Sequence, residues 1–373
     1  MKILFLLFTV CLLLFVSGCE EKKEIHPSSK VIRVGLLAPL SRVNRKYGYQ
    51  SLIGMKFANK KAAYLSNGDK IIFEIVDTNS SVLGTQKGLE YLIEKNVTAI
   101  ISFVSSHNML ALKDLLHNIT TPMIVTLATN DEITKLNNSI SQICMSNQRE
   151  ALVAAHYIKD EKFINSAGIV YNSTNPYSLS LAIQFREYYK KIRGEDTFFI
   201  NFANKNAIQK LRSYDMHNIE MLFSSLDAKE SVTVLKVIQH RDVDILLSDG
   251  TLSDAKENTK SELALFNGAY IIEHYASNMK KSRAYKGLQK ILKEDALEDS
   301  SYAFLAYDAY ALLYYTLQNC PNYEQKCINA LFQNSDIIQG IAGNFNMQNA
   351  KVKRKIYIDK IKDLRLIKEV VTY

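Results

Sequence analysis

Short apolar runs alternate with helix-like segments in two successive series along this 373-residue chain. This alternation constrains the fold more than any other feature. Strand-like runs occupy residues 31–37, 71–76, 99–103 and 123–126, and then 167–171, 197–200, 220–223 and 245–248. Between them, apolar residues recur every three or four positions, as at Leu52, Met55 and Ala58. Alternating units of this size build parallel sheets that helices cover on both faces. The sequence therefore predicts an α/β fold of two lobes, each with its own sheet.

A cleft between two such lobes is a common place for a small ligand. Ligands of open α/β sheets bind outside the carboxyl ends of the strands, so the residues that follow the strands are the candidate site. In the first half, Ser105 and Ser106 open a helix after the third strand, and Thr129 follows the fourth strand. Hydroxyls beside exposed helix N–H groups suit a carboxylate, although serine at a helix start is also an ordinary N-cap.

The second half of the chain places acidic residues after two different strands, Asp227 after one and Asp249 after another. Two acids in such positions could meet an ammonium group. Acids there also cap helices, so this alternative stays open at the level of the sequence.

Several signatures of enzymes and nucleotide-binding proteins are missing from the sequence. There is no G-x-x-x-x-G-K-[ST] loop, no G-x-G-x-x-G after a strand and no G-x-S-x-G turn. The seven histidines are dispersed, without a nucleophile–base pair or metal-ligand spacing. The 46 basic and 38 acidic residues give a net charge of +8, spread along the chain without the stripe of a nucleic-acid-binding surface. We therefore predict no catalytic residue, no metal, no cofactor and no nucleic-acid partner.

The first twenty residues resemble a bacterial export signal. The run from Ile3 to Val16 is almost wholly apolar, but it is shorter than the roughly 20 residues that a membrane-spanning helix needs. It ends in Val16-Ser17-Gly18-Cys19, which resembles a lipobox. We expect cleavage of residues 1–18, lipidation of Cys19 and a polar tether over residues 19–30. The protein would then be an extracytoplasmic, membrane-anchored lipoprotein, in the periplasm or on the outer face of the cell membrane. An ordinary signal peptide with an incidental cysteine is the alternative.

Three cysteines remain in the expected mature body. Because an exported protein can form disulfides, Cys320 and Cys327, which flank a turn-like segment, are expected to pair. Two reduced thiols are the alternative. Cys144 would be left over and buried.

Five segments carry a resemblance to a known protein family. They are Val34–Ser41 followed by Tyr47-Gly48, the pair Ser105-Ser106, Thr121–Thr129, Ala306–Ala309 and Gly340–Phe345. Their order over residues 31–370 is similar to that of the leucine/isoleucine/valine-binding protein family, the type I substrate-binding proteins of ABC importers. The resemblance implies two lobes, each a parallel sheet with helices on both faces, joined by three crossovers. It also implies a small ligand held between the lobes and delivery to an ABC permease.

The resemblance assigns roles to the candidate residues. The expected ligand contacts are Tyr47, Ser105, Ser106, Leu127, Thr129, Tyr177, Asp227 and Asp249. In the family, hydroxyls after the third and fourth strands and the nearby backbone hold a ligand carboxylate, and an acid at the position of Asp249 meets an amino group. Asp227 stands where an aromatic residue is usual and would add either a second acid or a polar pocket for the ligand side chain. For Tyr47 and Tyr177, packing or surface exposure is the alternative.

The resemblance also divides the chain between the lobes. The first lobe would combine residues 31–145 with 273–337, and the second lobe 146–272 with 338–373. The three crossovers would lie near residues 144–147, 271–274 and 338–343.

The expected function is therefore that of a lipid-anchored solute-binding protein. It would capture an amino acid or a similar small molecule and deliver it to a permease in the membrane. The alternative is a non-transport lipoprotein of the same fold that acts as a sensor or regulates a cell-envelope enzyme.

Overall fold

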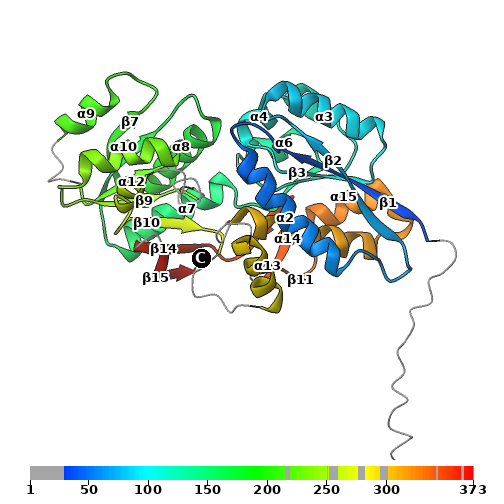
Figure 1. The fold of residues 1–373 in the computed structure, drawn as a ribbon. Helices are drawn as coiled ribbons and strands as arrows, with labels where there is room; N and C mark the ends of the chain where they lie inside the picture. Colours follow the sequence, from blue (N-terminus) through cyan, green and yellow to red (C-terminus); the bar gives the residue numbers. More distant parts are fainter. Residues whose placement is uncertain are drawn as a thin grey trace, which may run out of the picture.

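The computed structural model describes residues 29–214, 219–249, 251, 259–275, 282–294, 301–341, 343–362 and 365–372. It has two lobes, each built around one sheet (Figure 1). The signal segment, Cys19 and most of the expected tether lie outside the described residues.

The first sheet has eight strands in the order β11-β12-β13-β5-β4-β3-β1-β2. They are β1 (Val31–Ala38), β2 (Lys70–Asp77), β3 (Ala99–Ser102), β4 (Met123–Val125), β5 (Ile140–Gln142), β11 (Ile338–Gln339), β12 (Asn344–Gln348) and β13 (Lys351–Lys353). The first five strands pair in parallel, and β11 to β13 add antiparallel pairs at one edge. The helices of this lobe are α2 (Arg45–Lys61), α3 (Val82–Glu94), α4 (Ser106–Leu110), α5 (Lys113–His117), α6 (Glu132–Leu136), α13 (Arg283–Glu294), α14 (Ser301–Asn319), the 3-10 turn Pro321–Tyr323 and α15 (Gln325–Gln333).

The second sheet has seven strands in the order β15-β14-β10-β9-β8-β6-β7. They are β6 (Ser166–Tyr171), β7 (Glu195–Asn201), β8 (Met221–Ser224), β9 (Asp244–Leu247), β10 (Tyr270–Glu273), β14 (Tyr357–Lys362) and β15 (Arg365–Thr372). Here β6 to β10 are parallel, whereas β14 and β15 are antiparallel. The helices of this lobe are α7 (Asn147–His156) with a π-helical turn (Tyr157–Glu161), α8 (Pro176–Lys191), α9 (Ala207–Ser213), α10 (Ala228–Ile238) and α12 (Lys260–Ala264).

The central strands of each sheet are buried on both faces, which explains why most of their residues are apolar. In β1, Leu36 packs in the core that contains Met55 of α2, whereas its neighbour Leu37 packs with Leu89 of α3 on the other face. In β6, Ile169 and Val170 likewise belong to cores on opposite faces. The predicted α/β fold with helices on both faces is confirmed.

The chain crosses between the lobes after β5, after β10 and between β13 and β14. The sequence prediction placed the third crossover near residues 338–343, and the sheet corrects this. β12 and β13 form a hairpin over the two-residue turn Asn349-Ala350, where both φ angles are positive, and β13 pairs with β5 through Lys351 and Gln142. Residues 338–353 therefore belong to the first sheet rather than to the second lobe.

The described residues include the three cysteines of the expected mature body, and their helices can be compared with the length of a membrane span. A disulfide joins Cys320 and Cys327, whose Cα atoms are 5.6 Å apart, and it links the end of α14 to α15. Cys144 is a buried free thiol. Within the described ranges, no helix has both the length and the apolar character needed to cross a membrane.

Candidate ligand-binding site

Asp249, directly after β9, is the centre of a buried polar cluster in the second lobe. Tyr177 donates its hydroxyl to Asp249 Oδ1 at 2.7 Å, and Nε2 of His274 lies 3.2 Å from Oδ2. The backbone N–H of Asp249 donates to Oε1 of Glu150 at 2.9 Å. These partners come from the starts of α8 and α7 and from the end of β10, so two elements hold the carboxylate of Asp249 and a third holds its backbone.

Local capping explains why α8 presents Tyr177 to this cluster. Asn175 is the N-cap residue, and its side chain accepts the N–H of Tyr177, while Pro176 occupies the first turn. Ser146 caps α7 in the same way and accepts the N–H of Arg149, which places Glu150 in the first turn of that helix.

The two carboxyl groups of the cluster have opposite protonation tendencies. Burial acts to raise the pKa of Asp249, but hydrogen bonds from His274 and Tyr177 and the charge of the His274 ring outweigh it and lower this pKa. Burial also raises the pKa of Glu150 well above its usual range, and the neighbouring charge of Asp249 adds to the rise. Of the two carboxyl groups, Glu150 therefore holds a proton more readily, and the negative charge lies on Asp249 beside the His274 ring.

Replacing Glu150 with glutamine should flatten the pH dependence of stability. The unfolded chain loses the Glu150 proton near the ordinary pKa of 4.5, whereas the folded protein keeps it to higher pH, so the wild-type protein loses stability as pH rises above that value. Glutamine has no such proton, and its Oε1 can still accept the N–H of Asp249. We expect the variant to become increasingly more stable than the wild type between about pH 5 and 7. Urea unfolding at a series of pH values checks this, and a stability difference that stays constant with pH would contradict it.

Two hydroxyls of the first lobe are buried close to this cluster. Thr129 is 5% exposed, and its Oγ1 has no hydrogen-bond partner among the described residues. Oγ of Ser106 accepts the backbone N–H of Asn130 at 3.2 Å and keeps its own hydroxyl proton for another acceptor. A buried hydroxyl without a partner is costly, so Thr129 is suited to receive a ligand oxygen.

Hydrogen bonds connect the segment that contains Thr129 and Asn130 with the second lobe. The N–H of Asn147 donates to the carbonyl of Thr129 at 2.9 Å, and its side-chain amide donates to the carbonyl of Tyr177 at 3.0 Å. The side chain of Asn130 donates to the carbonyl of Pro176 at 3.1 Å. Helices α4 and α6 of the first lobe thus face α7 and α8 of the second lobe across this contact (Figure 1).

Cys144 confirms how close the two halves of the site are. Its thiol contacts the carbonyl of Ala128, the neighbour of Thr129, at 3.5 Å. Burial is the main reason that the pKa of Cys144 is raised, and the charge of Asp249 contributes next. The charge of Asp249 thus acts on a thiol that also contacts the segment of Thr129.

The structure brings four of the eight predicted contacts into this network, namely Ser106, Thr129, Tyr177 and Asp249. The other four have different surroundings. Tyr47 packs on Tyr302, with ring centroids 4.8 Å apart, and Leu127 packs against the first-lobe core. Ser105 is half-buried at the N-cap position of α4. Asp227 is exposed, and its Oδ1 caps α10 by accepting the N–H of Glu230 at 2.8 Å.

Sequence reasoning missed Glu150, His274 and Asn147. Glu150 and Asn147 lie in the first turn of α7, where such residues usually serve the helix itself. His274 follows β10, a strand that the sequence reading treated only as a crossover. The signal that could have found His274 is the rule that placed Asp249, namely a polar residue directly after a parallel strand.

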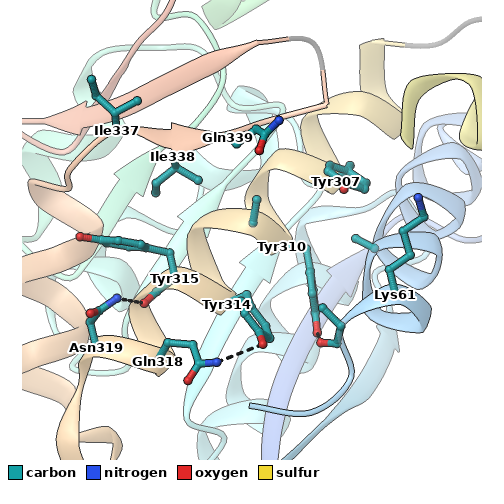
Figure 2. Close-up of a pocket in the computed structure, with 13 residues that line it drawn as sticks. Lys61, Tyr307, Tyr310, Tyr314, Tyr315, Gln318, Asn319, Ile337, Ile338 and Gln339 are labelled. Carbon is teal, nitrogen blue, oxygen red and sulfur yellow. Dashed lines mark hydrogen bonds between the residues drawn. The ribbon is translucent and has the colours of Figure 1, made fainter. Parts of the chain in front are cut away.

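A pocket of about 400 Å³ lies in the first lobe between α2, α14 and β11, apart from the Asp249 cluster (Figure 2). Four tyrosines of α14 line it, and three of their hydroxyls are bonded to the protein. Tyr310 donates to Ala62, Tyr314 to Tyr64 and Tyr315 to Asp336. None of the predicted ligand contacts lines this pocket.

Two α/β lobes, joined by three crossovers and carrying buried polar groups where they meet, define a two-lobed binding protein. A family model described as periplasmic binding protein matches residues 31–364, so the chain belongs to that family. The family implies an extracytoplasmic location. The solved structures of this fold that are described below are named as leucine- or solute-binding proteins, and none of these names is that of an enzyme.

Solved structures share the fold at low sequence identity. A leucine-binding protein from Thermotoga maritima is 17% identical over 91% of this chain and 98% of its own, with a TM-score of 0.79. A branched-chain amino acid transporter substrate-binding protein from Streptococcus pneumoniae, solved with isoleucine, is 17% identical over 92% and 100%, with a TM-score of 0.76. A solute-binding protein from R. palustris, solved with 4-hydroxybenzoate, is 16% identical over 92% and 97%, with a TM-score of 0.77. A search of curated protein sequences gives no match to this chain.

Proposed function

We propose that this protein is a lipid-anchored extracytoplasmic solute-binding protein that holds an amino acid or a similar small zwitterion between its lobes and delivers it to an ABC permease. The observation that carries the proposal is the charged carboxylate of Asp249, whose side chain is 12% exposed and is held by Tyr177 and His274. The negative charge of this carboxylate would attract a ligand ammonium, which would join Tyr177 and His274 as a further partner of Asp249.

The other end of the ligand would meet the first lobe. The unpaired hydroxyl of Thr129 and the free hydroxyl proton of Ser106 are donors suited to a carboxylate. Because these donors and Asp249 belong to different lobes, one zwitterion would bridge both. Its binding would then favour the closed arrangement of the lobes through differential affinity.

The anchor and the transport partner rest on the sequence. Val16 to Cys19 resembles a lipobox, and residues 19–30 would tether the folded body to the bilayer. Relatives with this fold are named as binding proteins of ABC transporters, which supports a permease as the recipient.

A ligand panel tests the proposal. Mass spectrometry of small molecules that co-purify with the protein, followed by calorimetry, would compare the common amino acids with 4-hydroxybenzoate. We expect binding of at least one α-amino acid and weaker binding of the aromatic acid, because the latter has no ammonium group for Asp249. Binding of aromatic acids alone would contradict the ligand class, and binding of nothing in the panel would favour the regulatory alternative.

A further inference from the structure

The positive charge of the chain is concentrated on two helices. α2 and α13 together contain nine basic residues and one acid, Glu294, and therefore carry a net charge of +8. This equals the net charge of the whole chain, so all other residues contain equal numbers of basic and acidic side chains. In the sequence the charge looks evenly spread, because these two helices are more than 200 residues apart along the chain.

The fold brings the two helices together in the first lobe (Figure 1). Gly287 of α13 lies against the Phe57 ring of α2 so closely that a Cβ at Gly287 would be 3.0 Å from Phe57 Cζ. Both helices use their apolar faces for the core, through Met55 and Ala58 in α2 and through Leu288 in α13.

The basic side chains lie on the outer faces of these helices. In α13, Lys286, Lys290 and Lys293 recur at three- and four-residue spacing and are exposed. In α2, Lys56 and Lys60 are exposed, four residues apart, and no acidic residue occurs in the helix. We call the exposed basic residues of the two helices the α2–α13 surface; its members are Arg45, Lys56, Lys60, Lys61, Arg283, Lys286, Lys290 and Lys293.

The N-terminal segment enters the folded body at one end of this surface. The carbonyl of Lys30 accepts the N–H of Lys70, and the carbonyl of Ala63, two residues after α2, accepts the N–H of the adjacent Ile71. The end of α2 that carries Lys60 and the entry point of the chain are therefore neighbours. From Cys19 to residue 28 the chain can span at most about 35 Å.

We propose that the α2–α13 surface binds the anionic headgroups of the membrane to which the protein is tethered. The lipid anchor is part of the proposed function, but the charge and geometry of the surface are independent of it. Juxtamembrane lysines and arginines attract anionic lipid surfaces and act within a Debye length. A short tether that enters beside Lys60 would keep the surface in that range and hold the lobe in one orientation over the bilayer.

Vesicle binding tests the proposal without the anchor. Because the signal segment and Cys19 precede the folded body, the protein can be produced as residues 19–373 with Cys19→Ser. We expect it to co-sediment with vesicles of two parts phosphatidylcholine to one part phosphatidylglycerol, to lose this binding in high salt and not to bind phosphatidylcholine alone. Lys286→Gln, Lys290→Gln and Lys293→Gln together should weaken binding about tenfold or more. A second variant, Lys56→Gln with Lys60→Gln, should weaken it in the same direction.

A matched control removes the same charge from the second lobe. Lys205, Lys210 and Lys229 are exposed near α9 and α10, and their change to glutamine should leave vesicle affinity within about twofold. Equal losses in both triple variants, or no binding of the wild type, would overturn the proposal. The proposal would also be overturned if the α13 variant bound vesicles normally but no longer stimulated the permease. The surface would then bind an acidic protein. Ligand affinity in the same variants reports on the solute-binding proposal separately, and the mass of the membrane-extracted protein reports on lipidation.

Discussion

Replacing Asp249 with asparagine should weaken binding of the best amino acid in the panel by about two orders of magnitude. Asparagine keeps the shape of the side chain and can still accept the Tyr177 hydroxyl, but it removes the negative charge of Asp249. Loss of one partner of a buried, hydrogen-bonded charge pair costs roughly 2–5 kcal/mol. Isothermal titration calorimetry at neutral pH measures the effect.

Asp227→Asn is the matched control, because it makes the same chemical change after another strand of the same sheet. Asp227 is exposed and caps α10, and asparagine is an equally good cap, so we expect affinity within about twofold of the wild type. Unchanged affinity in Asp249→Asn, or an equal loss in both variants, would show that the ligand does not place a cation at Asp249.

The sheets were predictable from the sequence because their central strands are buried on both faces. Ile100 and Ile101, or Leu246 and Leu247, give continuous apolar runs that stand out between helices. β5 was not predicted, because it contains only three residues and two of them, Ser141 and Gln142, are polar although buried. A short strand of this composition is recognisable only from its neighbours β4 and β13.

The helix that was expected to open at Ser105 and Ser106 is divided in the structure into α4 and α5. The residues around Ala111 and Leu112 carry no glycine or proline, so the sequence contains no signal for this break. Leu112 is buried in the core on this face of the sheet, together with Met109 and Leu116. The helix is therefore interrupted at a position where Leu112 packs into the core, and local helix propensity did not predict this interruption.

The sequence predicted those residues of the candidate site that follow recognisable strands, but not the others. Asp249 and Thr129 follow parallel strands, and the topology alone brings such positions to one edge of each sheet. Glu150 joins them through a contact between residues 99 apart, and His274 reaches Asp249 from a strand with no long apolar run. Asp227 satisfied the same positional rule as Asp249, and only the structure distinguishes an exposed cap from a buried charge.

Replacing Asp308 with alanine should lower the free energy of unfolding by about 3–5 kcal/mol, the usual effect of removing one partner from a buried ion pair. Asp308 lies on α14, and its Oδ2 is 3.0 Å from a guanidinium nitrogen of Arg354 on the third crossover. It also accepts the N–H of Ile341 at 2.7 Å and the hydroxyl of Tyr275, beyond β10, at 3.2 Å. One carboxylate thus joins two crossovers to the first lobe. Urea unfolding of both proteins at neutral pH measures the change.

Asp196 supplies the control for this effect because its carboxylate is also buried but its partners are not. Its side chain is 8% exposed, whereas those of Arg186 and Lys190 are 41% and 51% exposed. Solvent can replace these partners, so Asp196→Ala should cost about 1 kcal/mol or less.

A second test combines Asp308→Asn with Arg354→Met, which removes the unpaired charge and should recover part of the loss. If Asp308→Ala costs no more than Asp196→Ala, the buried pair does not stabilise the crossovers, and their geometry must depend on the apolar contacts of Tyr275 and Ile341 instead.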